Sequence, residues 1–321
     1  VQYSINNNSW VKDTLSLTGK LPPFDTILFN FLVPFQASAQ GNYSVCTNIT
    51  PQITNDPDNS DSFCVTKCLG LGGTYTIDAN GNGDYTSFSA AITALNSCGI
   101  SDSVVFNILP GNYVERVDLY NITGSSASKT ISFIGAGTDS TYLIHAGTSN
   151  NRAVISLDGT DHVRFKNMTI QNISSSSSVG VYLRSGADSN IIENCSILVS
   201  TTTSSSNIPI LFSSSESSYY GYGNNGNYNL FKNNYVKGGY FGVRLNGSDK
   251  SNLSYGNRFV GNTFENHYYY GISAYYQSGT VYKFNRLKNI GSSYGYGIYQ
   301  YYCTKSTIYG NNISPGRYGM Y

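Results

Sequence analysis

The sequence predicts an all-β protein in two parts: a partial β-sandwich over residues 1–68, and a parallel β-helix over residues 69–321 that starts with a short capping α-helix. Three observations predict this fold. Short runs of alternating apolar and polar residues fill the first part, phrases with a period of 22–29 residues fill the second, and one short amphipathic stretch lies between them. β-type residues at such a period, without intervening helices, are typical of β-helix coils.

Residues 1–68 contain four strand-like runs, DTLSLTG, DTILFNFLV, NYSVCTNI and SFCVTKC. Turn signals separate them, and a period of two between such breaks indicates antiparallel strands. Four strands are too few for a closed sandwich of about seven. We therefore expect the missing strands to precede Val1, and we expect further coils after the final GRYGMY.

The capping helix is predicted in SFSAAITAL. Its apolar residues fall on one stripe: Phe88, Ala91, Ile92 and Leu95. Thr86 or Ser87 can cap its start and Gly99 can end it. A helix at this place would cover the open end of the first coil, which otherwise exposes an apolar cross-section and an unpaired strand edge.

Two phrases recur along the coils. In the first, a glycine precedes an apolar residue and then a variable residue, and side chains in a strand alternate between the two faces. We expect the apolar residues to form one interior column: Val181, Val243, Ile272, Ile298 and Met320. In the second phrase an asparagine stands two residues before an apolar residue. We expect these asparagines to form a structural ladder at a turn: Asn234, Asn262, Asn285 and Asn311.

Two segments resemble known families. The stretch from LPPFDT to NDPDNSDSFCV resembles the second half of adhesion-related, CARDB-like immunoglobulin-like domains of bacteria. GNGDYTS, the helix and NILPGNYVE together resemble the entrance of right-handed parallel β-helices of the pectin-lyase-like superfamily. The resemblance implies a large protein of a Bacteroidota-type bacterium, secreted or displayed on the cell surface through type IX secretion.

The composition is asymmetric. Only 12% of the residues are charged, and the net charge is +1. Residues 219–321 hold 10 Lys and Arg, two acids (Asp249 and Glu265) and 21 of the 29 tyrosines. A basic, tyrosine-rich part favours an anionic partner. No apolar run is long enough for a membrane span, and we expect no nucleic-acid partner and no cofactor.

Tyrosine and arginine occupy the predicted outer positions of several coils. The candidate ligand-binding residues are Tyr182, Arg184, Arg244, Tyr275, Tyr299 and Tyr301. Tyrosine rings suit sugars, and arginine suits carboxylate or sulfate groups. Two interpretations stay open: a surface for acidic polysaccharide or a neighbouring fibre subunit, or aromatic stacking that only stabilises the coils.

No catalytic or metal site is predicted. The entrance also resembles that of pectin methylesterases, but ENCSILVSTTT carries Ser and Thr where those enzymes need a Gln–Asp pair. The carboxylates of LDGTDHVRF, Asp158 and Asp161, are interpreted as turn residues beside His162. Glu115 and Asp118 are expected to line the rim of the first coil. Cys64-x3-Cys68 lacks the second ligand pair of a zinc site.

The cysteines predict disulfides and an oxidising compartment. We expect Cys46–Cys64 and Cys68–Cys98, with Cys46–Cys68 as the alternative. A further resemblance, to the Asp-Ser/Thr motif of Bacteroidota surface glycoproteins, implies O-glycans on at least one of Thr14, Thr26, Ser103 and Ser140.

These features favour a structural or adhesive segment, a stalk or fibre element, of an extracellular bacterial protein that binds acidic polysaccharide. The rival is a polysaccharide lyase or hydrolase whose active site lies outside this segment. A third interpretation is a spacer without a ligand. We expect no enzymatic activity from the segment itself.

Overall fold

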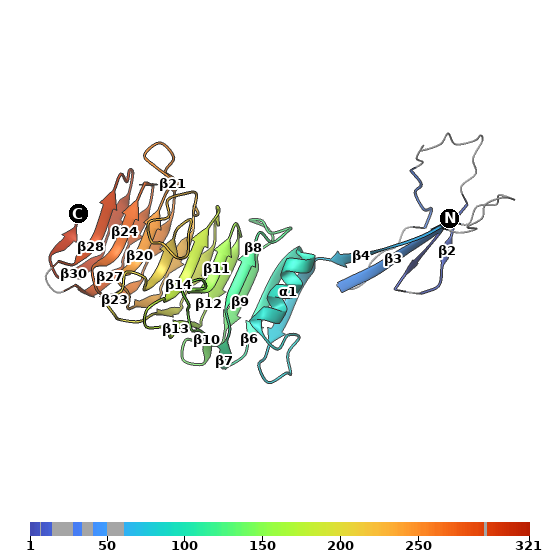
Figure 1. Ribbon diagram of the computed structural model, residues 1–321, viewed down its shortest axis with the longest axis horizontal. Coiled ribbons are helices and arrows are strands. Elements are labelled where there is room, and N and C mark those ends of the chain that lie inside the picture. The colour runs from blue at the N-terminus through green and yellow to red at the C-terminus, as the bar shows by residue number, and fades with distance from the viewer. Residues whose placement is uncertain (7, 15–27, 34–40, 50–60, 292–293) are drawn as a thin grey trace. The chain divides into compact units, whose positions relative to one another are not determined.

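The computed structural model describes residues 1–6, 8–14, 28–33, 41–49, 61–291 and 294–321 (Figure 1). The chain divides into two compact units, Val1–Leu71 and Gly72–Tyr321. The predicted glycosylation residue Thr26 lies outside the described residues. No helix among the described residues is long and apolar enough to cross a membrane.

The described part of the first unit is an antiparallel sheet with the strand order β2-β1-β3-β4. Its strands are β1 (Gln2–Ile5), β2 (Val11–Lys12), β3 (Gly41–Ile49) and β4 (Asp61–Leu69). β1 was not among the predicted strands, whereas β3 and β4 correspond to NYSVCTNI and SFCVTKC. This sheet fits a partial β-sandwich. The immunoglobulin-like family of the unit stays a prediction.

Cysteine pairing follows from the register of β3 and β4. Cys46 and Cys64 face each other across the two strands and form a disulfide, which confirms the predicted pair. The alternative Cys46–Cys68 is therefore wrong. Cys68 and Cys98 are disulfide-bonded as well, and their pairing with each other stays a prediction.

The second unit is a right-handed parallel β-helix of about 9 turns with one short helix, which confirms the predicted fold. Three parallel sheets run along the β-helix, and they are called the β7 sheet, the β8 sheet and the β6 sheet after one strand of each. The β7 sheet contains β7 (Gly111–Val114), β10 (Thr141–His145), β13 (Thr169–Asn172), β16 (Ser196–Leu198), β19 (Tyr235–Lys237), β23 (Thr263–His267), β27 (Arg286–Ile290) and β30 (Asn312–Pro315).

The β8 sheet contains β8 (Val117–Tyr120), β11 (Ala153–Asp158), β14 (Val179–Arg184), β17 (Ile208–Phe212), β20 (Phe241–Asn246), β24 (Tyr270–Tyr275), β28 (Tyr296–Tyr301) and β31 (Tyr318–Met320). The β6 sheet contains β5 (Leu71–Ile77), β6 (Ile100–Ile108), β9 (Ile131–Gly135), β12 (Val163–Lys166), β15 (Ile191–Glu193), β18 (Leu230–Lys232), β22 (Arg258–Val260), β26 (Val281–Lys283) and β29 (Thr307–Tyr309). A short pair, β21 (Ser254–Tyr255) and β25 (Gln277–Ser278), lies beside them.

Helix α1 (Phe88–Cys98) begins and ends where the sequence predicts. The Ser87 hydroxyl accepts a hydrogen bond from the amide of Ala90, and Gly99 ends the helix with φ 64°. The Glu115 carboxylate accepts hydrogen bonds from the amides of Phe88 and Ser89 at 2.9 and 2.8 Å. Glu115 therefore satisfies amide groups that have no partner within the helix, and its negative charge lies at the positive end of the helix dipole. The predicted rim residue thus has a definite structural role.

The predicted interior column is confirmed. Val243 pairs with Ile272, Ile272 with Ile298 and Ile298 with Met320 in successive strands of the β8 sheet. The first three side chains are fully buried, whereas Met320, in the last coil, is 56% exposed. Stacked phenylalanines continue the core on the β6 sheet, since Phe106, Phe133 and Phe165 follow one another with ring centroids 4.9 Å apart.

Asparagines form a ladder at the turn before the β7 sheet. The side-chain oxygen of Asn262 accepts from the amide of Asn234 at 2.9 Å, and Asn285 does the same for Asn262. The ladder continues to Asn311. Each side-chain NH₂ donates to a backbone carbonyl of the preceding coil, as Asn262 does to Phe231 at 2.9 Å. The ladder thus satisfies buried backbone groups that a sharp turn leaves without partners.

Candidate functional site

The candidate ligand-binding residues all lie in the β8 sheet. Strand pairing brings Arg244, Ser273 and Tyr299 into one outer column and Asn246, Tyr275 and Tyr301 into another. The strands β20, β24 and β28 therefore pair in the register that the sequence predicts. The exposure of these residues differs from coil to coil, however, and divides the face into two zones.

Over the earlier coils the outer side of the β8 sheet is covered. Tyr182 and Arg244 are each 1% exposed. Tyr182 belongs to a second apolar cluster outside the coil, made of Ala153, Val179, Tyr182, Ile208, Leu211 and Phe241. The guanidinium of Arg244 contacts the Phe241 ring of this cluster. Tyr219 packs against this cluster from the segment that follows β17. The expectation that Tyr182 and Arg244 present themselves to a ligand is therefore corrected, because this segment covers them.

Arg244 is held by neutral groups. Its Nε donates to the backbone carbonyl of Tyr219 at 3.1 Å and to the Asn246 side chain at 2.8 Å, and its Nη1 donates to the Ser273 hydroxyl at 2.9 Å. Its guanidinium carbon lies 3.9 Å from the Tyr275 ring centroid. Within the part of the chain that the structure describes, no carboxylate forms an ion pair with Arg244. The surrounding aromatic rings stabilise its charge.

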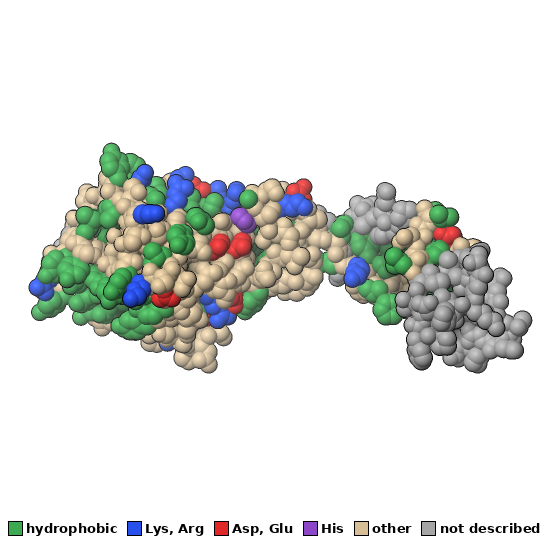
Figure 2. Space-filling model, turned by 90° about the horizontal axis from the view of Figure 1, so that it is seen from above, with side chains coloured by type: hydrophobic (Ala, Val, Ile, Leu, Met, Phe, Trp, Pro, Cys, Tyr) green, Lys and Arg blue, Asp and Glu red, His purple; other side chains and the backbone are tan. Residues whose placement is uncertain are grey.

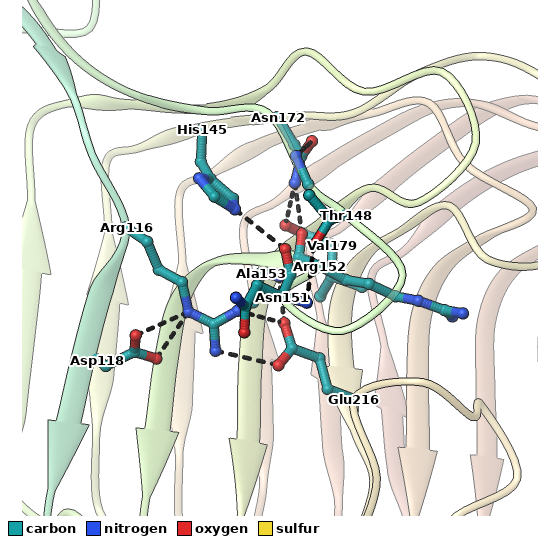
Figure 3. A network of polar contacts seen from close by, with 11 residues as sticks. Arg116, Asp118, His145, Thr148, Asn151, Arg152, Ala153, Asn172, Val179 and Glu216 are labelled. Atoms are coloured by element: carbon teal, nitrogen blue, oxygen red, sulfur yellow. Dashed lines mark hydrogen bonds and ion pairs between the residues drawn. The ribbon is translucent and has the colours of Figure 1, made fainter.

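The covering segment is anchored at its other end by Glu216 (Figure 3). Both Glu216 oxygens accept from the guanidinium of Arg116, at 2.8 and 3.0 Å, and one also accepts from the amide of Ala153. Asp118 accepts from Nε of the same arginine at 2.8 Å. This contact has no signal in the sequence, because 100 residues separate Arg116 from Glu216 and no local pattern connects them.

Arg184 is also engaged. It forms an ion pair with Asp158 at 2.5 Å and lies 5.9 Å from the Tyr182 ring centroid. Its side chain is 38% exposed, so the pair is only partly screened from solvent. The two arginines that supported an acidic ligand are therefore either buried or paired.

Over the last coils the outer side of the β8 sheet is open, and tyrosines cover it. We define the tyrosine face by these residues: Tyr270, Tyr275, Tyr296, Tyr299, Tyr301, Tyr318 and Tyr321. Tyr270 stacks on Tyr296 at 5.3 Å, and Tyr296 stacks on Tyr318 at 5.1 Å. Two neighbouring rows run parallel, with Tyr275 and Tyr301 at 5.3 Å and Tyr299 and Tyr321 at 5.7 Å. All these residues are exposed or half-buried.

The tyrosine face carries little charge. The strands β20, β24, β28 and β31 contain no Asp or Glu. Burial raises the pKa of Tyr299 to about 12 and also raises the pKa of Tyr270 and Tyr296. Arg317 stacks on Tyr318 at 4.9 Å. In Figure 2 the hydrophobic side chains, with which tyrosine is coloured, gather toward the C-terminal end of this unit.

Carboxylates gather elsewhere, at the turns that follow β8, β11 and β14. A groove of about 590 Å³ is lined there by Tyr120, Asn121, Asp158, Gly159, Asp161, Ser185, Gly186, Asp188 and Asn224. Asp161 accepts from the amide of Asp188, and Asp188 accepts from the amide of Asn227, each at 2.7 Å. Burial raises the pKa of Asp188. These bonds match the turn role interpreted for Asp161, and Asp188 and Asn227 continue it in later coils.

The described residues were also predicted to hold no metal, and three of them are candidates for O-glycans. Among the described residues, no group of three or more His, Cys, Asp and Glu side chains could hold a metal ion. Thr14 is exposed, whereas the hydroxyls of Ser103 and Ser140 donate to backbone carbonyls and are partly covered. O-glycosylation at these residues stays a prediction, and Thr14 is the most accessible of the three.

Comparison with solved structures returns carbohydrate-active enzymes of low identity. Carrot pectin methylesterase is 15% identical with a TM-score of 0.44, over 79% of this chain and 90% of that one. The rice weevil pectin methylesterase is 16% identical with a TM-score of 0.44, over 71% and 69% of the two chains. The GH87 α-1,3-glucanase of Streptomyces thermodiastaticus strain HF3-3 is 17% identical with a TM-score of 0.42, over 75% and 45%. At such identities the likeness concerns the fold alone.

The family comparison covers most of the second unit. No curated protein matches the chain. Residues 111–320 match the family described as the right handed beta helix region. They include the asparagine ladder, the buried arginine and the tyrosine face except Tyr321. The chain therefore belongs to the right-handed β-helix family.

Proposed function

We propose that this chain is a structural and adhesive segment of an extracellular bacterial protein, and that it binds polysaccharide through the tyrosine face. The observation that supports this most is the face itself. Its tyrosines form contiguous rows across three successive coils, and they remain accessible where the equivalent positions of earlier coils are covered. Large exposed apolar patches on a protein surface mark interaction sites, which supports a binding role for this face.

The chemistry of the face favours binding over cleavage. Hydrolysis of a glycosidic bond needs two carboxyl groups on either side of the bond, and the strands of the face carry none. The carboxylates of the groove near Asp158 are engaged, since Asp158 pairs with Arg184 and Asp161 supports the next turn. A lyase or hydrolase with its active site outside this segment is the alternative function.

The proposed location rests on cysteine chemistry. The Cys46–Cys64 disulfide favours an oxidising compartment such as the cell exterior. The adhesion-type immunoglobulin-like domain, the Bacteroidota origin and the type IX route belong to the same proposal. They are supported by the resemblance of residues 1–68 described above.

The proposal is tested by glycan-array binding of the full chain, purified with its disulfides intact. We expect binding to at least one polysaccharide class, lost when Tyr275, Tyr299 and Tyr301 are replaced together by Ala. The control replaces three exposed tyrosines outside the face, Tyr228, Tyr255 and Tyr309. Absence of binding by the wild-type chain, or equal loss in both triple variants, would contradict a binding role for the face.

A further inference from the structure

The orientation of the tyrosine rings decides what the face offers to a ligand. Phe241, Tyr270, Tyr296 and Tyr318 follow one another in successive coils, with centroid separations of 5.1, 5.3 and 5.1 Å and interplanar angles of 7°, 19° and 24°. Tyr299 and Tyr321 are nearly parallel, at 5°. Within these rows each ring is therefore covered by the ring of the next coil, up to Tyr318 and Tyr321, which end them. In the third row Tyr301 is tilted by 43° against Tyr275.

A stacked ring cannot also stack on a sugar. Aromatic recognition of a sugar ring requires a free ring face, and within the rows those faces already contact one another. What remains accessible at a half-buried, stacked tyrosine is its outer edge and its hydroxyl group. The rows therefore present a series of phenol hydroxyls, repeated once per coil.

The hydroxyls are neutral over a wide pH range. Burial raises the pKa of Tyr299 to about 12 and raises the pKa of Tyr270 as well. A protonated phenol both donates and accepts a hydrogen bond. Sugar hydroxyls have the same double capacity, so a row of phenols and a row of sugar hydroxyls are chemically complementary.

Charge on the face does not favour an anionic ligand. Arg244 is buried beneath the covering segment, and Arg184 is paired with Asp158. Arg317 lies against Tyr318, at the end of one row. An acidic chain would bring repeated negative charges to a face whose central strands β24 and β28 contain neither Lys nor Arg.

The distance between neighbouring coils indicates how a polysaccharide would lie on the tyrosine face. Neighbouring strands lie about 4.8 Å apart, so the hydroxyls repeat along the coil axis at close to that interval. Sugar units in an extended polysaccharide repeat at a comparable distance. A ligand lying along one strand, such as β28, would instead meet the half-buried Tyr296 and Tyr299 beside the exposed Tyr301.

We infer that the tyrosine face binds an extended, uncharged polysaccharide that lies parallel to the coil axis, and that rows of phenol hydroxyls, rather than ring faces, recognise it. This inference rests on the proposed polysaccharide-binding function and names its ligand class.

The test separates hydroxyls from rings. In the full chain, Tyr270, Tyr296, Tyr299 and Tyr301 are replaced together by Phe, which removes four hydroxyls and keeps the stacked rings. The control replaces Tyr228, Tyr255 and Tyr309 by Phe. Binding is measured by calorimetry and affinity electrophoresis with hydroxyethylcellulose and xyloglucan as uncharged probes and alginate as the acidic probe, at low and high salt.

We expect the wild-type chain to bind an uncharged probe with little dependence on salt. Each removed hydroxyl should weaken binding about fivefold, which corresponds to ~1 kcal/mol per hydrogen bond, and the control should bind like the wild type. If the fourfold variant does not fold, the pair Tyr299→Phe and Tyr301→Phe, near the exposed edge, should still weaken binding about 25-fold.

Two results would overturn the inference and leave the proposed function intact. One is unchanged affinity of the Phe variants, with loss only in Ala variants, which would assign recognition to the rings. The other is binding to alginate alone, weakened by salt. A wild-type chain that binds none of the probes and no glycan on the array would instead overturn the proposed function itself.

Discussion

The guanidinium of Arg244 lies 3.9 Å from the ring centroid of Tyr275, one strand further along the β8 sheet. This contact joins the two zones of the outer face. Arg244 belongs to the covered zone, where it holds the backbone of Tyr219, and Tyr275 belongs to the open tyrosine face. A buried cation thus fixes both the covering segment and the first tyrosine of the open rows.

Replacing Arg244 should therefore destabilise the fold and disturb the face together. Arg244→Lys keeps the charge but loses the planar group that reaches Tyr219, Asn246 and Ser273 at once. We expect a loss of about 2–4 kcal/mol in the free energy of unfolding, because hydrogen-bonding groups are left buried without partners. The free energy of unfolding is measured by urea titration. The exposed Arg258, changed to Lys, is the control and should alter stability by less than about 0.5 kcal/mol.

Glu216→Gln should release the covering segment locally. The substitution leaves Arg116 with Asp118 as its remaining charged partner, in a site where both side chains of the original pair are about 15% exposed or less. We expect a loss of about 1–3 kcal/mol. Hydrogen exchange should also become faster at residues 213–222 than in the interior strands.

The control for Glu216 is Asp139→Asn, which changes an exposed acid in a turn. It should leave exchange in residues 213–222 unchanged. Equal protection of this segment in Glu216→Gln and the wild type would show that the apolar contacts of Tyr219, rather than Glu216, hold the segment in place.

Features that repeat along the chain could be predicted from the sequence. The period of the Gly-apolar phrase gave the register of Val243, Ile272 and Ile298, since a one-residue error would have moved these side chains out of the core. The capping helix was equally predictable, because its stripe and its caps are local signals.

The covering segment could not be predicted in the same way. The two-residue alternation places Tyr182 and Arg244 outside the coil correctly, but it carries no information about what lies on top of them. Burial of both side chains depends on Glu216 and Tyr219, which reach back across several strands from an irregular stretch rich in Ser and Gly. Contacts between residues so far apart have no local signature in a single sequence.

Asn262→Ala should be strongly destabilising. Asn262 accepts from the amide of Asn234 and donates to the carbonyl of Phe231, and it is 1% exposed. Alanine leaves both backbone groups buried without partners, at a cost of about 2–5 kcal/mol. Thermal unfolding followed by circular dichroism measures the change. Asn112→Ala, an exposed position of β7, is the control, and a similar drop in both variants would contradict a special role for the ladder.

His267 should make stability depend on pH between about 4 and 6.5. It is 1% exposed, its Nδ1 lies 2.5 Å from the carbonyl oxygen of Gly238, and burial lowers its pKa to about 4. The unfolded chain, with an ordinary histidine pKa near ~6.5, binds the proton more readily than the folded chain in this window.

Because the folded pKa is lower, the contribution of His267 is fully present above pH ~6.5. It falls as the pH decreases toward 4, by roughly 3 kcal/mol in all. Urea titrations at a series of pH values should show this slope, and it should flatten in His267→Gln. The partly exposed His145, changed to Gln, should leave the slope as in the wild type. A slope that survives in His267→Gln would assign the pH dependence to other groups, such as the carboxylates near Asp188.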